Sequence, residues 1–381
     1  MAGESTSGPM YEQIFEALKE RILHHKYKVG DRVPSEKELC DEFGVSRITS
    51  KKALEMLAAE QLIIRQPGRG SFVADGSGEP VQKIVPQPAG RGRKNKLLIG
   101  LVITTFSDMY GTELIYGMEE ASRERDSFLV IRRSFGIPEQ EDRMIQELLE
   151  LGVDGLIIFP VQGEFFSAEI LKLVIEKFPF VLIDRYLKGI PASSVITDNI
   201  KAAREGTEHL LSLGHRNIAF LTQPPANTTA IEERIEGILE VYAEAGIPAS
   251  RELWYESLLS SLPNVFDPQA RRRDVDHLVE HLKSHPEITA LFAAEYHIAM
   301  LAVEAAEQLK LRIPEDLSLI CFDSSESVEH CEITHMRQDQ FQMGKKAFEM
   351  VVDMQKGETA VQRIQLPASL VTGNSTETVR K

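Results

Sequence analysis

Apolar positions in the first 75 residues follow a helical period and then a strand-like pattern. Apolar side chains recur every three or four residues at Tyr11, Ile14, Leu18 and Ile22, which predicts a helix over about residues 10–25. Beyond residue 60, two short runs of β-prone residues replace this spacing. The chain therefore begins with helices and continues into a β-hairpin.

Two further helices are marked by the residues at their ends. Ser35 and Glu38 form an S-x-x-E capping box, in which each side chain satisfies a backbone donor at a helix start. This helix stops at Gly44, and Ser46 is a good N-cap for the next helix. A helix, a tight glycine turn and a second helix in this order predict a helix-turn-helix.

The predicted hairpin follows this pair of helices directly. Apolar runs at residues 62–64 and 71–73 flank residues 67–70, which read Pro-Gly-Arg-Gly. A hairpin placed after a helix-turn-helix forms a winged helix. We therefore expect residues 1–75 to fold as an N-terminal winged helix-turn-helix DNA-binding domain.

The rest of the chain alternates apolar runs with helical patterns. The runs lie at residues 97–103, 128–131, 155–159, 180–183, 217–221, 290–293 and 319–322. Such alternation predicts an α/β fold with parallel sheets and helical crossovers. Residues 97–381 exceed what one sheet needs, so we expect two similar lobes with a cleft between them. Residues 76–96, rich in Gly, Pro and basic residues, are predicted to be a linker.

Charge and cysteine content narrow the class of protein. The net charge is −15, and the acidic excess lies in the C-terminal part, so a DNA contact belongs to the N-terminal part. The three cysteines form no C-x-x-C pair, which favours a reducing compartment. No secretory signal is evident, and no run of about 18 or more apolar residues occurs. We expect a cytoplasmic protein that does not enter a membrane.

The second helix of a helix-turn-helix presents its N-terminal residues to base edges in the major groove. The candidate DNA contacts are Ser46, Arg47, Thr49, Ser50, Lys51 and Lys52, with Arg69 at the tip of the wing. Arg47 can pair bidentately with a guanine, whereas Lys51 and Lys52 suit phosphates. Each cation alone would also fit a solvated helix face, but their joint placement favours DNA.

The same region resembles the GntR family of winged-helix regulators. The match covers about residues 10–75 and includes Pro-Ser-Glu-Lys-Glu-Leu at 34–39, Ser-Arg-Ile-Thr at 46–49 and Gly-Arg-Gly-Ser-Phe-Val at 68–73. The resemblance implies dimeric DNA binding, with Lys37, Arg47, Thr49 and Gly70 among the contacts. One departure is Lys51-Lys52, where the family often has Val or Ile followed by Arg, and it affects the target sequence.

Residues 97–376 resemble a different family, the LacI/GalR effector domain, which is similar to periplasmic sugar-binding proteins. The resemblance rests on the order of several strings, among them Ile-Gly-Leu-Val at 99–102, Val-Asp-Gly-Leu-Ile at 153–157, Leu-Ile-Asp-Arg at 182–185, Arg-Ile-Glu-Gly at 234–237 and Phe-Asp at 322–323. It implies a two-lobed, Rossmann-like, periplasmic-binding-protein-like domain that senses a small sugar. A GntR-type head on this body resembles the arabinose-operon repressor type.

Ligands of open α/β folds bind outside the carboxyl ends of the strands. The candidate ligand contacts are Thr105, Phe106, Tyr110, Asp184, Arg185, Arg234, Glu295 and Asp323, and the family resemblance adds Gln338 at a crossover between lobes. Arg234 offers a fork of donors, whereas Asp184 and Asp323 offer acceptors. The aromatic side chains, together with Phe159 and Trp254, can stack on a sugar ring or can simply pack in the core.

One departure from the family bears on the ligand. The family commonly has Asn-Asp where this chain has Glu295-Tyr296. A carboxylate at this position favours a neutral sugar, a polyol or an aminated ligand. It disfavours a sugar phosphate unless Arg185 or Arg234 compensates.

Three other hypotheses are alternatives to a sugar-responsive repressor. An enzyme lacks support, because the chain has no G-x-S-x-G, P-loop or H-E-x-x-H motif. His277 and His281 share a helix face, but a third metal ligand is not evident, so we expect no metal and no cofactor. A transport-binding protein would need a signal peptide. An activator stays open, and for either regulator the effector can also be a sugar derivative or a non-sugar. The expected partners are operator DNA, a small-molecule effector and a second copy of the chain.

Overall fold

The computed structural model describes residues 9–24, 26–60, 62–66, 70–74, 96–163, 167–263, 267–324, 333–357 and 360–379. The chain divides into two compact units, Met1–Gly92 and Arg93–Lys381. The division falls within the predicted linker, whose residues 76–95 lie outside the described residues.

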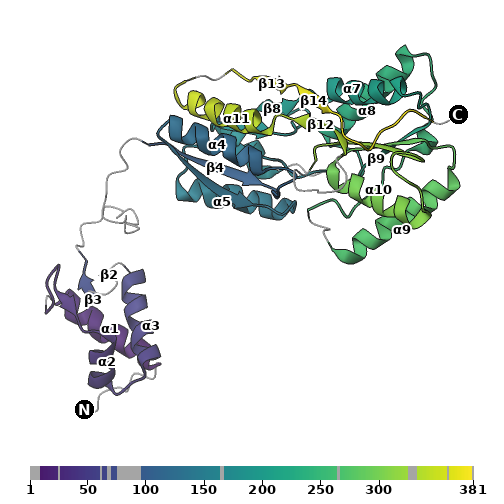
Figure 1. Ribbon diagram of the computed structural model, residues 1–381. Coiled ribbons are helices and arrows are strands. Elements are labelled where there is room, and N and C mark those ends of the chain that lie inside the picture. The colour runs from purple at the N-terminus through teal and green to yellow at the C-terminus, as the bar shows by residue number, and fades with distance from the viewer. Residues whose placement is uncertain are drawn as a thin grey trace. The chain divides into compact units, whose positions relative to one another are not determined.

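The first unit is a winged helix-turn-helix, as the sequence predicts (Figure 1). Its elements are α1 (Met10–Leu23), β1 (Arg32–Val33), α2 (Glu36–Phe43), α3 (Arg47–Ala59), β2 (Ile63–Gln66) and β3 (Gly70–Val73). Strand β3 pairs antiparallel with β2 and with β1. The two-residue strand β1 was not predicted, because it is too short to show a period.

The predicted helix ends of this unit are present. The Ser35 side chain accepts from the backbone of Glu38, whose side chain accepts from the Ser35 backbone at 2.6 Å. Gly44 ends α2 in the left-handed conformation with φ 63°, and the Ser46 side chain caps α3. These caps fix the start of α3, the helix expected to read DNA.

The first lobe of the second unit is a six-stranded parallel sheet in the order β13-β8-β7-β6-β4-β5. Its strands are β4 (Leu98–Ile103), β5 (Phe128–Arg133), β6 (Gly155–Ile158), β7 (Phe180–Ile183), β8 (Ser193–Thr197) and β13 (Arg363–Leu366). One face is covered by α4 (Thr112–Glu124) and α11 (Gln340–Gln355), and the other by α5 (Pro138–Leu151) and α6 (Ala168–Glu176) (Figure 1).

The second lobe contains a five-stranded sheet in the order β14-β12-β11-β10-β9. Its strands are β9 (Ile218–Leu221), β10 (Ala290–Ala293), β11 (Ser318–Phe322), β12 (Thr334–Gln338) and the antiparallel β14 (Ala368–Val371). Its helices are α7 (Asn199–Ser212), α8 (Thr229–Glu244), α9 (Pro268–Ser284) and α10 (Tyr296–Leu309), with a 3-10 turn η1 (Arg251–Leu253). Phe220, Phe292 and Phe322 fill its core.

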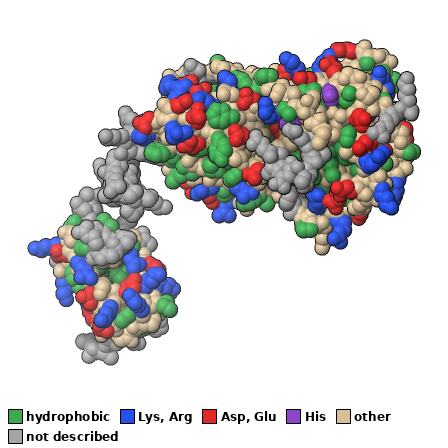
Figure 2. Space-filling model, viewed as in Figure 1, with side chains coloured by type: hydrophobic (Ala, Val, Ile, Leu, Met, Phe, Trp, Pro, Cys, Tyr) green, Lys and Arg blue, Asp and Glu red, His purple; other side chains and the backbone are tan. Residues whose placement is uncertain are grey.

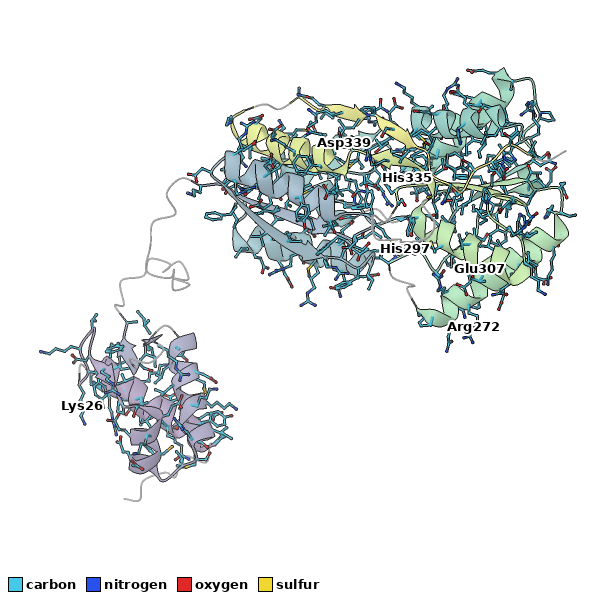
Figure 3. All side chains as sticks on the ribbon, in the orientation of Figure 1. Lys26, Arg272, His297, Glu307, His335 and Asp339 are labelled. Atoms are coloured by element: carbon cyan, nitrogen blue, oxygen red, sulfur yellow. The ribbon has the colours of Figure 1, made fainter. Side chains whose placement is uncertain are left out.

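The chain passes between the lobes three times. It leaves the first lobe after β8, returns after β12 and leaves again after β13. The second passage ends at Asp339, which caps α11 (Figure 3). Strands β8, β12, β13 and β14 were not predicted, because each mixes polar and apolar residues and lacks a long apolar run. None of the described helices has the length and apolar character needed to span a bilayer.

Two glycines allow α4 and α11 to approach closely. A Cβ atom at Gly117 would lie 2.0 Å from the carbonyl oxygen of Phe341, and one at Gly344 would lie 2.0 Å from that of Leu114. Both obstacles are backbone atoms, so a larger residue at either position forces the helices apart.

We predict that Gly117→Ala lowers the free energy of unfolding by about 1–3 kcal/mol, as overpacking of a close contact does. Urea unfolding of the purified variant measures this. The control is Glu119→Ala on the exposed face of the same helix, whose i,i+4 pair with Arg123 spans 3.0 Å. This control should change stability by no more than about 0.5 kcal/mol. Equal stability of the Gly117 variant and the natural protein would contradict the close packing.

Candidate functional site

The N-terminal turn of α3 exposes the cations that are predicted to meet DNA. Arg47 is 81% exposed, and its Nε lies 3.5 Å from Glu36 Oε2. Lys51 pairs loosely with Glu55 at 3.8 Å. Lys37, on α2, is also exposed. Figure 2 shows Lys and Arg mixed with Asp and Glu on the visible face of this unit, so its cations are partly neutralised within the fold.

Three other predicted contacts have partners within the first unit. Ser46 caps the helix, and its hydroxyl lies 2.9 Å from that of Thr49. The Lys52 ammonium lies 3.7 Å from the centre of the Tyr11 ring. Lys52 therefore links α3 to α1 through a cation–π contact in addition to presenting charge.

The structure corrects the prediction for Ser50. Its side chain is fully buried; its hydroxyl donates to the Arg47 carbonyl at 3.1 Å and lies 3.3 Å from Cys40 Sγ. Ser50 therefore faces the core of the unit rather than a groove of DNA. Gly70, at the start of β3, has φ 114°, and a Cβ there would lie 2.9 Å from Arg32 Nε. Arg69 lies outside the described residues.

Two aspartates occupy equivalent positions in the two lobes. Asp184 follows β7 and Asp323 follows β11, and both take the left-handed conformation, with φ of 69° and 57°. Asp184 accepts from the Tyr110 hydroxyl at 2.5 Å and pairs with Arg185 at 3.0 Å. Burial, followed by the charge of Asp184, raises the pKa of Tyr110 well above its usual value, so the phenol stays a donor.

Arg234 projects from α8 into the same region and is 5% exposed. It donates to Asn199 Oδ1 at 2.9 Å and to the Ala294 carbonyl at 2.5 Å, and its guanidinium lies 3.6 Å from the centre of the Phe322 ring. Burial lowers the pKa of Arg234, whereas the nearby carboxylates of Asp184 and Asp323 raise it. The cation thus lies within electrostatic reach of acids from both lobes.

Asp323 is held by residues at a crossover between the lobes. Gln338 donates to it through its side chain at 2.5 Å and its backbone at 3.3 Å, and Gln340 donates at 3.4 Å. Gln338 in turn accepts from Thr197 at 2.6 Å. Burial raises the pKa of Asp323 to about 6, although the bonds from Gln338 and the charge of Arg234 oppose this shift.

Thr197, Asn199 and Gln340 were not predicted as site residues. Thr197 and Asn199 flank the first crossover, and Gln340 follows the second. The side-chain Oε1 of Gln340 accepts from the backbone N–H of Gly111, next to Tyr110. Asp198 and Asn199 stand between β8 and the body of α7, and this position could have suggested a site role.

Glu295 has an unsatisfied oxygen. It precedes α10, directly after Ala294, and its Oε1 is buried without a hydrogen-bond partner among the described residues. The charge of Glu295 also raises the pKa of Arg234, so Glu295 interacts electrostatically with this cluster of residues. A buried carboxylate oxygen in this state accepts a donor from a ligand or from water.

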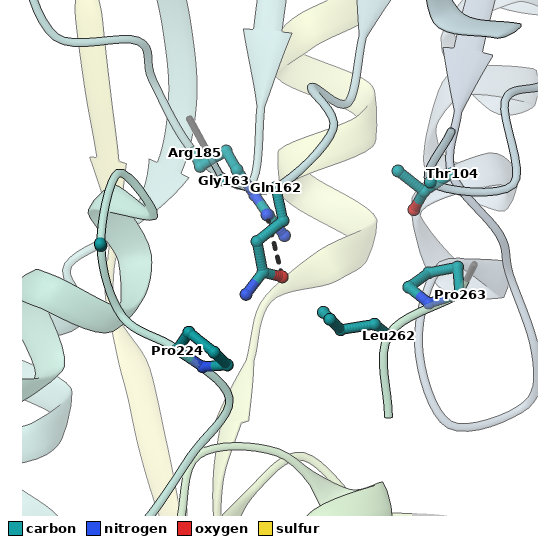
Figure 4. Close-up of a pocket in the computed structure, with 9 residues that line it drawn as sticks. Thr104, Gln162, Gly163, Arg185, Pro224, Leu262 and Pro263 are labelled. Carbon is teal, nitrogen blue, oxygen red and sulfur yellow. Dashed lines mark hydrogen bonds between the residues drawn. The ribbon is translucent and has the colours of Figure 1, made fainter. Parts of the chain in front are cut away.

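A cavity of about 320 Å³ lies beside this polar cluster, between the lobes (Figure 4). It is lined by Thr104, Gly136, Gln162, Gly163 and Arg185 from the first lobe, and by Pro224, Ala226, Leu262 and Pro263 from the second. Arg185 joins the two regions, because it pairs with Asp184 and also donates to Gln162 at 3.4 Å. Gln162 points into the middle of the cavity (Figure 4).

The predicted ligand residues therefore fall into two groups. Tyr110, Asp184, Arg185, Arg234, Asp323 and Gln338 come together, with Glu295 beside Arg234. Thr105 instead accepts from Arg133 at 2.8 Å, and Phe106 is 39% exposed beneath the same arginine. Trp254 packs against Phe220 with ring centres 5.6 Å apart, so it belongs to the core.

The histidine pair on α9 has other partners. The His281 Nε2 lies 2.8 Å from the Leu253 carbonyl, and the His277 ring lies near Tyr255. Within the described part of the chain, no group of three His, Cys, Asp or Glu side chains is placed to hold a metal ion.

Comparison with known proteins matches a part of each unit to a family. Residues 10–73 match the family of bacterial regulatory proteins of the gntR type, and residues 207–376 match the periplasmic binding protein-like domain. The chain therefore combines a GntR-type helix-turn-helix domain with a periplasmic-binding-protein-like domain of the LacI type. This agrees with the resemblances seen in the sequence.

Among the relatives, one matches nearly the whole length of this chain. It is the arabinose metabolism transcriptional repressor of Geobacillus stearothermophilus, 26% identical over 97% of this chain and 98% of its own. Two solved structures share the fold. One is a LacI family regulator from Enterococcus faecium with bound ribose (24% identity, TM-score 0.60, 74% and 100% covered). The other is the transcriptional regulator CelR with cellobiose (21% identity, TM-score 0.63, 97% and 100% covered).

The raised pKa of Asp323 makes stability depend on pH in a definite direction. The folded protein releases this proton at about pH 6 and the unfolded chain near pH 3.8, so stability falls as pH rises between these values. We predict that Asp323→Asn removes this dependence, which amounts to about 2–3 kcal/mol. Urea unfolding of both proteins at several pH values measures it.

A matched control uses another buried carboxyl group. Burial raises the pKa of Glu141 to about 7, so Glu141→Gln should change the pH dependence over a range that extends to about pH 7. If Asp323→Asn leaves the pH dependence of the natural protein unchanged between pH 4 and pH 6, then the raised pKa of Asp323 is wrong.

Proposed function

We propose that this regulator is a homodimeric repressor of carbohydrate-utilisation genes whose affinity for operator DNA changes when a small hydroxyl-rich ligand binds between its lobes. The main supporting observation is a pair of buried hydrogen bonds, from Gln338 to Asp323 and from Thr197 to Gln338, which joins a candidate ligand residue to two crossovers between the lobes. The presence of a recognition helix on the same chain gives such a cleft a regulatory use.

The effector that fits the cleft is a neutral sugar, a polyol or an amino sugar. Carboxylates from Asp184, Asp323 and Glu295 outnumber the guanidinium groups of Arg185 and Arg234 there. The cavity of about 320 Å³ is at the small end of ligand pockets, which suits one or two sugar rings. The names of the relatives, which include arabinose and ribose repressors, also favour a sugar.

The proposed mechanism is a shift between two conformations of the ligand-binding unit. A ligand that bonds to side chains of both lobes stabilises the arrangement in which those side chains converge. In a dimer this changes how readily two heads engage two related half-sites of DNA. The ligand shifts DNA binding only as far as its affinities for the two conformations differ. The proposed mechanism includes no catalytic step. We propose that the protein acts in the cytoplasm, where it meets the DNA.

The effector class is tested by thermal unfolding of the full-length protein with a panel of pentoses, hexoses, polyols, amino sugars and sugar phosphates. A ligand at about one hundred times its dissociation constant should stabilise the protein by about 2.7 kcal/mol. We expect a member of the neutral or amino group to do so and sugar phosphates to fail. Glu295→Gln should weaken the binding of an amino sugar more than the binding of the corresponding neutral sugar. Stabilisation by sugar phosphates alone would refute this assignment.

The DNA-reading surface is tested by binding to a duplex selected from a random library by the full-length protein. Arg47→Ala should lower the preference for the selected site by about 1–3 kcal/mol, as loss of one base contact does. Lys51→Ala should weaken binding to all sequences alike and reduce the salt dependence by about one released counterion. Equal losses on selected and unrelated duplexes for Arg47→Ala would show that Arg47 contacts only the backbone.

A further inference from the structure

The first unit exposes a large apolar side chain where its cations gather. Ile48 is 81% exposed, more than any other large hydrophobic side chain that the structure describes. It stands in the first turn of α3, directly after Arg47, which is exposed to the same extent. Exposed isoleucines occur singly on many surfaces, so its surroundings decide whether this one has a use.

Packing within the unit does not account for Ile48. The buried face of α3 consists of Ser50, Ala53, Leu54 and Leu57, and Ile48 lies on the opposite face with Lys51 and Lys52. Helix propensity does not account for it either, because β-branched residues are poorer helix formers than alanine or leucine. The side chain therefore contributes nothing evident to the stability of the head.

The neighbours of Ile48 identify the kind of partner. Arg47, Lys51 and Lys52 surround it on the exposed face, and α3 carries no acidic residue in its first turn. Charged residues are depleted at the core of protein–protein interfaces, whereas cations around a recognition residue are typical of DNA interfaces. The major groove presents one apolar group at base edges, the C5-methyl of thymine.

We propose that Ile48 reads a thymine by packing against its C5-methyl group in the major groove, beside the base contact of Arg47. This inference rests on the proposed DNA-binding function. It makes Ile48 a specificity-determining residue, since the methyl distinguishes thymine from cytosine and from both purines at that edge. Burial of one methyl-sized group corresponds to about a fourfold change in affinity per half-site.

The test removes the methyl from the DNA and the side chain from the protein. The full-length protein first selects a duplex from a random library. Each thymine of one half-site is then replaced singly by deoxyuridine, which differs from thymine only in the missing methyl. Dissociation constants are measured for the natural protein, for Ile48→Ala and for the control Ile64→Ala, whose side chain is 49% exposed on β2.

We expect one deoxyuridine substitution to weaken binding of the natural protein and of Ile64→Ala about fourfold. Ile48→Ala should bind the thymine and deoxyuridine duplexes equally. Persistent sensitivity to deoxyuridine in Ile48→Ala would overturn the inference, as would a half-site at which no deoxyuridine substitution affects the natural protein. Failure to select any duplex would instead overturn the proposed DNA-binding function, and this inference with it.

Discussion

A charged group that is buried away from water needs hydrogen-bond or ion-pair partners close to it. The arrangement of the ligand-binding unit depends on this requirement. Asp184, Arg234 and Asp323 are each less than a tenth exposed. Their partners come from several separate stretches of the chain: Tyr110, Arg185, Asn199, Ala294, Gln338 and Gln340. No one of these groups can move far without leaving another unsatisfied, so the network moves as a unit.

The crossovers between the lobes are part of this network. Thr197 stands where the chain first leaves the first lobe, and Gln338 stands where it returns. Their mutual hydrogen bond, and that of Gln338 to Asp323, place crossover residues in contact with an acid that we propose binds the ligand. A ligand that takes over one of the bonds of Asp323 therefore changes the forces on the hinge directly. The close packing of α4 on α11 helps the first lobe to respond as a rigid body.

The elements that the sequence predicted are those with strong local signals. Capping residues and helical periods marked α1, α2 and α3, and long apolar runs marked the central strands of both sheets. The sequence did not predict strands β8, β12, β13 and β14. Their pairing with neighbouring strands, rather than their local composition, makes them strands. These same strands lead to the crossovers, so Thr197 and Gln340 were missed with them.

The site residues show the same division. Asp184 and Asp323 were predictable because each directly follows an apolar strand. The inward direction of Ser50 was missed, although its spacing to Ala53, Leu54 and Leu57 places all four on one face of a helix. The unsatisfied oxygen of Glu295 and the ring contact of Lys52 depend on atoms far apart in the chain, and a sequence pattern does not contain them.

The internal ion pairs of the head affect how the regulator searches a genome. Glu36 and Glu55 stand beside Arg47 and Lys51, so phosphates of an unrelated duplex must compete with carboxylates already in place. A head of this kind spends less time on random DNA than a strongly basic one. A larger share of the regulator then remains free of random DNA.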